Sequence, residues 1–311
     1  MASLHVGDSI SVAPASEGKW TDLLLPLSDR QLFRHVVEQH FVGLSDYGNP
    51  ELGTVTGAND FFAINEQTRE RFNLTEGQVA PICPPGSRHL KSTAFTKAQW
   101  RRLRDAGERV WLLHPDPDDQ SEGLRRYIRH GEAEAVDQAY KCQVRSPWWR
   151  PPMVSPPDLF FTYMSHRYPR LVHNAAGVSF VNSMHGVRLK RGVPGAVRTA
   201  LPLLAFNSVT MLGAEIHGRA YGGGILKMEP KEAAVLPVPA TEHVLAASNM
   251  LTAERDHLDR LLKSGLWTNV AKRVDEILLQ DTMRLSGEEV AQLHGAAASL
   301  RARRMGHRST T

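Results

Sequence analysis

The chain has 311 residues, of which 41% are apolar, 23% are charged and 7% are aromatic. This composition fits a globular protein and excludes disordered, collagen-like and disulfide-scaffold classes. A formal net charge of +4 permits a polyanionic partner without requiring one. The two cysteines, far apart in sequence, predict buried thiols. Because no leader pattern and no apolar run of about 18 residues occurs, we expect a cytoplasmic protein with no membrane partner.

The first part of the chain predicts several short elements. Apolar residues recur at helical spacing over 29–41, which indicates an amphipathic adaptor helix. The stretch 52–65 favours two β runs around a Gly-Ala-Asn turn, a hairpin or a strand–turn–strand. Capping patterns at Thr96 and Ser121 open two short helices with three arginines each, and Gly131 is the expected end of the second.

The middle of the chain is richer in strand signals. Residues 108–115 predict a buried strand, and 140–189 predict an irregular sheet made of short runs separated by prolines and a glycine. A single helix is expected over 201–218. After it, a loop with three glycines leads into a last strand near 225–228, and the sequence Leu-Pro-Val-Pro closes this unit.

The last part of the chain is predicted to be helical from Glu242 onward. Two apolar stripes indicate two helices, and Ser286 with Glu289 caps a third. Residues 301–311 contain four arginines and no acid, which is typical of a solvated basic tail rather than of a packed element.

These elements predict an α+β fold: an irregular mixed or antiparallel β-rich recognition domain with short helices, followed by a small C-terminal helical region. The expected divisions are an N-terminal adaptor segment at 1–45, a recognition domain at 46–240, and a C-terminal helical region with its basic tail at 241–311.

Sequence signals for catalysis or cofactor binding are weak. The glycine run 222–224 precedes a strand, so it lacks the helix N-terminus that would hold a phosphate. The histidines show no metal-ligand spacing, and ordinary imidazoles are the favoured interpretation. Neither a Gly-x-Ser-x-Gly elbow nor a local cysteine-nucleophile signature is present.

Two segments combine side chains that suit a nucleic acid. Residues 145–152 place two tryptophans between two arginines in a proline-stiffened loop, and guanidinium with indole suits phosphate or base contact. Tryptophans that fill the core beneath the loop are an equal alternative. Residues 182–188 combine an amide, an imidazole and a guanidinium, and amide and guanidinium groups can bind base edges.

A family resemblance rests on several segments read in order. They are GTVTGANDFFAIN (53–65), SRHL (87–90), LLHP (112–115), YIRHGE (127–132), RSPWW (145–149), PDLFFTYM (157–164), FNS (206–208) and YGGGILKMEPKEAAVLPVP (221–239). Together they resemble the C-terminal, DNA-recognising half of TaqI-like adenine-specific DNA methyltransferases of restriction-modification and related phage-defence systems. The resemblance spans about 50–240.

In that family a separate catalytic half carries an S-adenosylmethionine loop and an Asn-Pro-Pro-aromatic motif. This chain has neither, and the proline pairs at 83–86 and 155–158 lack the stacking aromatic. The resemblance therefore implies a non-catalytic specificity subunit or a truncated copy, with no cofactor of its own and S-adenosylmethionine on a catalytic methyltransferase partner. It also implies that the sheet at 140–228 faces double-stranded DNA. The helices at 29–41 and 243–280 would pack on that partner or a second copy, or else close this chain's own core.

The expected DNA contacts are Arg145, Trp148, Trp149, Arg150, Asn182, His185, Arg188 and Arg219. The arginines and the tail are expected to hold phosphates, whereas Asn182 and Arg188 are the candidates for reading bases. Two alternatives stay open: a restriction endonuclease with dispersed carboxylates, and a structural subunit that binds another protein.

Overall fold

The computed structural model describes residues 20–306. The α-helices are α1 (Leu27–His40), α2 (Leu44–Tyr47), α3 (Asn59–Phe62), α4 (Glu66–Arg71), α5 (Lys97–Asp105), α6 (Glu122–Ala133), α7 (Tyr140–Gln143), α8 (Gly195–Leu204), α9 (Ser208–His217), α10 (Pro230–Ala234), α11 (Thr241–Lys263), α12 (Trp267–Asp275) and α13 (Gly287–Gly306). The strands are β1 (Phe41–Gly43), β2 (Pro50–Leu52), β3 (Ala63–Ile64), β4 (Val79–Pro81), β5 (Trp111–Leu113), β6 (Leu159–Phe161), β7 (Met164–Ser165), β8 (Leu171–His173), β9 (His185–Val187), β10 (Arg219–Tyr221), β11 (Ile225–Lys227) and β12 (Pro237–Pro239).

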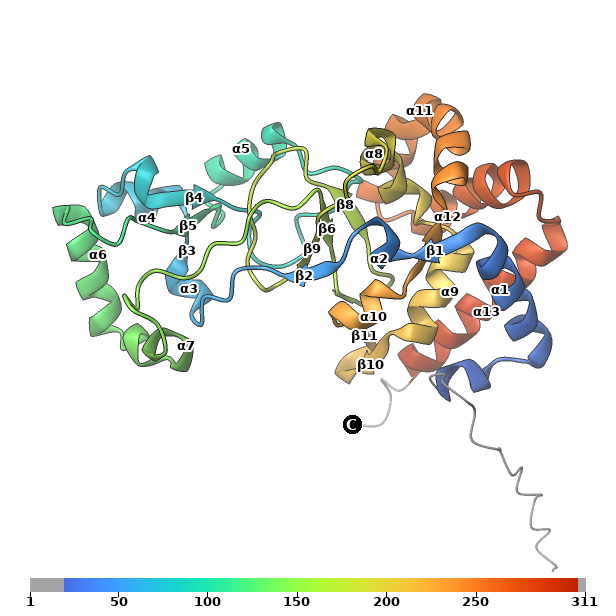
Figure 1. The fold of residues 1–311 in the computed structure, drawn as a ribbon, viewed down its shortest axis with the longest axis horizontal. Helices are drawn as coiled ribbons and strands as arrows, with labels where there is room; N and C mark the ends of the chain where they lie inside the picture. Colours follow the sequence, from blue (N-terminus) through green and yellow to red (C-terminus); the bar gives the residue numbers. More distant parts are fainter. Residues whose placement is uncertain (1–19, 307–311) are drawn as a thin grey trace, which may run out of the picture.

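The molecule is elongated. At one end α3, α4, α6 and α7 surround the small sheet β3-β5-β4; the sheet β2-β9-β6-β8 lies in the middle; and α1, α8, α9 and α11 to α13 form the other end (Figure 1). All paired strands run antiparallel in these sheets, in β10-β11-β7 and in the β1-β12 ladder. The predicted α+β fold, with small irregular sheets and a helical C-terminal region, is confirmed.

The central strand β6 is buried on both of its faces. Leu159 and Phe161 pack into the large helical core, whereas Phe160 points to the opposite side, where it meets Phe95 and Phe180. Alternate side chains of a strand point to opposite faces, so three consecutive apolar residues join two cores. Both cysteines are buried free thiols, as expected.

The two short arginine-bearing helices form, but the second continues past Gly131. Thr96 and Gln99 make the predicted capping box of α5. In α6 the helix continues to Ala133, so Gly131 is not its end. A Cβ on Gly131 would lie 2.6 Å from the Phe61 ring and 2.8 Å from the Trp148 ring. Glycine is therefore required there for close packing rather than for helix termination.

The predicted hairpin at 52–65 is wrong. Strand β2, which reaches this segment only at Leu52, pairs with β9; the last part, β3, pairs with β5, and helix α3 lies between them. The hydroxyl of Thr56 donates to the side-chain oxygen Oδ1 of Asn59 at 2.6 Å, at the start of α3. Such local hydrogen bonds favour a helix start over a β turn. The first run of the irregular sheet predicted over 140–189 is also a helix, α7, rather than a strand.

The single helix expected over 201–218 is two helices, α8 and α9, bent by 79°. Asn207 breaks the run, because its side chain accepts a hydrogen bond from the Thr210 N–H at 2.8 Å and so caps α9. Within 20–306 no single helix is long and apolar enough to cross a bilayer, although this bent pair passes by length and composition alone.

The basic tail expected at 301–311 is in part a packed helix. Residues up to 306 belong to α13, and Arg304 is buried, with two of its nitrogens 2.9 and 2.7 Å from the Glu215 carboxylate. The negative charge of Glu215 offsets the positive charge of Arg304. A basic residue can therefore be buried in this helix, which the composition of the segment did not predict. Residues 307–311, like 1–19 of the adaptor segment, lie outside the described residues.

Both chain ends contribute to one core. The predicted helix at 29–41 forms as α1, and its Phe33 and Val36 join the cluster that also contains Leu201 of α8 and Leu258 of α11. These helices thus bury much of their apolar surface within this chain. The Leu-Pro-Val-Pro run is a further strand, β12, paired with β1. The divisions after 45 and 240 stay a prediction.

Candidate nucleic-acid interface

The loop at 145–150 is tied to the small sheet end of the molecule. The Arg145 guanidinium donates to the Thr56 carbonyl and lies 4.9 Å from the centre of the Phe62 ring. Trp148 packs against Phe61 and Phe62, with ring centres 5.6 and 6.3 Å apart. Trp149 is partly exposed. Arg145 and Trp148 therefore make internal contacts that hold this loop in place.

Arg150 is also engaged within the protein. Its Nε donates to the Pro115 carbonyl at 2.8 Å, and its Nη2 lies 3.5 Å from Nε2 of His114. Burial lowers the pKa of His114, and the positive charge of Arg150 acts in the same direction. The imidazole is thereby favoured in its neutral form, which accepts from the guanidinium.

The segment 182–188 lies in and beside the central sheet. The Asn182 side-chain oxygen accepts from Asn59 at 3.2 Å. His185 is fully buried, stacks on Tyr163 with ring centres 4.4 Å apart, and has its Nε2 3.1 Å from the Met228 carbonyl. Burial lowers the pKa of His185. An imidazole in this position packs the core and does not present itself to a ligand.

Arg188 and Arg219 are exposed and ion-paired. Arg188 contacts Glu51 across the β2-β9 pair and donates to the Ser155 carbonyl at 3.1 Å. Arg219 pairs with Glu232 at 2.6 Å, beside the C-terminal helices. Of the eight expected contacts, Arg145 and Asn182 are joined through Thr56 and Asn59, whereas Arg219 lies beside the C-terminal helices.

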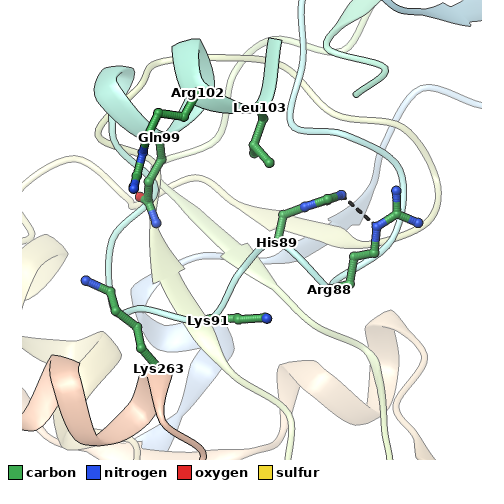
Figure 2. Close-up of a pocket in the computed structure, with 7 residues that line it drawn as sticks. All are labelled: Arg88, His89, Lys91, Gln99, Arg102, Leu103 and Lys263. Carbon is green, nitrogen blue, oxygen red and sulfur yellow. Dashed lines mark hydrogen bonds between the residues drawn. The ribbon is translucent and has the colours of Figure 1, made fainter. Parts of the chain in front are cut away.

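A different set of basic side chains does converge. A cavity of about 470 Å³ is lined by Arg88, His89, Lys91, Gln99, Arg102, Leu103 and Lys263. Figure 2 shows Gln99 and Arg102 reaching into it from α5, and Lys263 approaching from the end of α11. Four of these residues are cations, and none is a carboxylate. We call this the α5 basic pocket.

One carboxylate outside the lining holds the pocket's parts together. Asp259, one turn before Lys263 on α11, accepts from the Ser92 hydroxyl at 2.6 Å and from the N–H and hydroxyl of Thr93 at 3.0 and 2.8 Å. These bonds fasten the loop that carries Lys91 to the helix that carries Lys263. The pocket is therefore built from segments far apart in sequence.

The pocket keeps a positive excess despite one acidic neighbour. Glu108 pairs with Arg88 at 2.6 Å, and Arg88 donates to Nε2 of His89 at 2.9 Å. The pKa of His89 is lowered, mainly because its imidazole is buried. The positive charges of Arg88 and Lys91 also lower this pKa, and the negative charge of Glu108 opposes them. Within the described chain, the side chains of Lys91, Arg102 and Lys263 have no hydrogen bond or ion pair.

Such an arrangement suits an anion with several oxygens, such as a phosphate. Residues 20–306 contain no group of three or more His, Cys, Asp or Glu side chains placed to hold a metal ion. The sequence signal for this pocket is the arginine-bearing helix at 97–105 together with the basic SRHL segment. Its convergence with Lys263 depends on tertiary structure, which no local pattern reveals.

Comparisons with known proteins place the chain in a family. A model described as Type II methyltransferase M.Eco57I, C-terminal domain, matches residues 17–279. Type II methyltransferase M.AccI of Acinetobacter calcoaceticus is 24% identical over 197 residues, 62% of this chain and 36% of the relative. Type II methyltransferase M.XamI of Xanthomonas campestris pv. amaranthicola is 28% identical over 204 residues, 62% of this chain and 35% of the relative.

The fold also has a solved counterpart. The type IIG restriction endonuclease BpuSI matches with a TM-score of 0.52 and 15% identity, over 94% of this chain and 34% of that chain. The chain spans about a third of the length of these proteins. The resemblance to restriction-modification methyltransferases is confirmed, whereas the TaqI-like assignment stays a prediction. The chain belongs to the family of the C-terminal domain of Type II methyltransferase M.Eco57I.

Proposed function

We propose that this protein is the DNA-binding specificity component of an N6-adenine DNA methyltransferase in a restriction-modification, phage-defence system of the cytoplasm. The observation that carries the proposal is the α5 basic pocket, where three cations without internal partners line one cavity. Lys91 and Lys263 have no ion pair to break before they meet a phosphate, whereas Arg188 and Arg219 would first have to leave a carboxylate.

Two further observations support placing methyl transfer outside this recognition region. The relatives named as methyltransferases are about three times as long as the region they share with this chain. The glycine run Gly222–Gly224 forms a tight turn between β10 and β11, so it offers no helix N-terminus to the carboxylate or ribose of S-adenosylmethionine. We assign the methyl donor and the reacting adenine to that partner.

Salt dependence of duplex binding tests the phosphate contacts. Lys91→Ala and Lys263→Ala should each weaken binding to every duplex and reduce the slope of log K against log salt by about 0.9, because each removes one phosphate contact. Fluorescence anisotropy with a labelled duplex measures both quantities. Lys272→Ala, which removes an exposed lysine of α12, is the matched control and should leave the slope unchanged.

The same preparation separates the alternatives. Metal-dependent cutting of the duplex by the purified chain would support an endonuclease instead. No binding even at low salt would refute the proposal and favour a protein-interaction subunit. If all three lysine variants had the same slope of log K against log salt as the wild type, the DNA would bind elsewhere on the molecule.

Reconstitution tests the catalytic partner. A polypeptide with an Asn-Pro-Pro-aromatic motif, encoded beside this chain, should copurify with it, and transfer of a labelled methyl group to adenine should require both. Methylation by this chain alone, or S-adenosylmethionine bound to it in calorimetry, would contradict the two-component proposal.

A further inference from the structure

Helix α5 presents a polar face to solvent. None of its nine residues is buried, and its first turn is fixed by the capping box of Thr96. Ala98, Arg101, Arg102 and Asp105, spaced three and four residues apart, are exposed and lie along one face, which we call the α5 crest. In Figure 1 the helix lies along the upper margin of the ribbon.

Hollows lie on both sides of this crest. On one side is the α5 basic pocket, entered by Gln99 and Arg102. On the other is a cavity of about 210 Å³ whose lining includes Lys97, Trp100 and Arg101 of α5. The helix is thus a ridge between two depressions, and each depression has at least one lysine on its wall.

A helix that projects between two depressions has a shape that fits the major groove of B-DNA. The groove is about 12 Å wide and admits one α-helix, whose diameter with side chains is about 10–12 Å. A helix seated there has one sugar-phosphate strand on each side. The two depressions would receive those strands, with Lys91 and Lys263 beside one and Lys97 beside the other.

We propose that α5 enters the major groove and that Arg101 and Arg102 read guanine bases through N7 and O6. This inference rests on the proposed DNA-binding function and identifies the element that reads the sequence. Within the described residues neither guanidinium has a hydrogen bond or an ion pair, so each is free to form a bidentate pair. The two residues that the sequence favours for base reading instead make contacts within the protein. Asn182 accepts a hydrogen bond from Asn59, and Arg188 forms an ion pair with Glu51.

Selection from a pool of random duplexes tests the proposal. The wild-type protein, Arg101→Ala and Arg102→Ala should be incubated with the pool, and the bound duplexes sequenced. Each variant should lose preference for guanine at one position by about tenfold, the discrimination of one bidentate pair. Arg129→Ala, which removes an exposed arginine of the other short helix α6, is the matched control and should select the wild-type sequence.

A second pair of variants distinguishes base reading from charge. Arg101→Gln and Arg102→Gln should shift preference toward adenine at the same positions, because glutamine pairs with adenine N6 and N7. A loss of affinity that is equal for all duplexes, or an unchanged selected sequence in all four variants, would overturn the inference. A wild-type protein that binds duplex without selecting any sequence would also overturn it, whereas one that binds no duplex refutes the proposed function itself.

Discussion

Whether an arginine of this protein is available to bind a ligand depends on whether a carboxylate of the same chain pairs with it. Arg304 is buried because Glu215 receives two of its nitrogens, and Arg188 is held at the surface by Glu51. Arg101 and Arg102 have neither kind of partner within the described residues. The sequence gives the number of arginines but does not show which carboxylate each one meets. This is why sequence patterns favour the loop at 145–150 as an interface, whereas they indicate only that α5 is basic.

Asp275 shows how a buried carboxyl links stability to pH. Burial raises its pKa from 3.8 to about 7, although the hydroxyl and N–H of Ser208 donate to it at 2.6 and 2.8 Å. Between those two values the folded protein holds a proton that the unfolded chain has lost, so rising pH destabilises the fold. Asp275→Asn should remove this dependence, at most about 1.4 kcal/mol per pH unit.

Urea unfolding of the wild-type protein and of Asp275→Asn between pH 4 and pH 8 measures this effect. The variant should gain stability relative to wild type as the pH rises toward 7, and the difference should level off above it. Asp281→Asn, at an exposed position, is the control. A difference between variant and wild type that is constant over this range would contradict the assignment.

Elements with local signals are predictable from the sequence. The capping boxes at Thr96 and Ser286 depend on residues three apart, and the apolar stripes of α11 and α12 depend on helical spacing. Strand partners are not predictable in this way, since β2 and β3 are near in sequence but pair with β9 and β5. The role of Gly131 escapes local patterns for the same reason, because the rings of Phe61 and Trp148 reach it from other segments.

Two helical glycines should respond oppositely to alanine. Gly131→Ala should destabilise the protein by about 1–3 kcal/mol, because the new methyl group overlaps two aromatic rings. A Cβ on Gly295 of α13 would have no other atom within 4 Å, so Gly295→Ala should stabilise by up to about 1 kcal/mol through helix propensity. Chemical denaturation measures both, and the same sign for both would contradict this account of Gly131.

The α5 basic pocket belongs to the whole molecule rather than to any one element. Its walls come from the loop after β4, from α5 and from the end of α11, and the hydrogen bonds of Asp259 hold two of these together. Composition predicts a basic globular protein and the motifs predict its family, but this meeting of distant segments is a property of the packed chain. In this packing the four residues of the α5 crest remain exposed.

Replacing Asp259 sets two effects against each other. Loss of its negative charge should favour a polyanion, whereas loss of its bonds to Ser92 and Thr93 leaves buried donors unsatisfied, at a cost of about 1–3 kcal/mol, and frees the loop that carries Lys91. We expect positioning to dominate, so Asp259→Ala should weaken duplex binding severalfold. Asp256→Ala, which removes an exposed carboxylate from the same helix, should leave affinity unchanged or slightly higher. Anisotropy titrations at one salt concentration compare the two, and tighter binding by both would mean that charge alone governs the pocket.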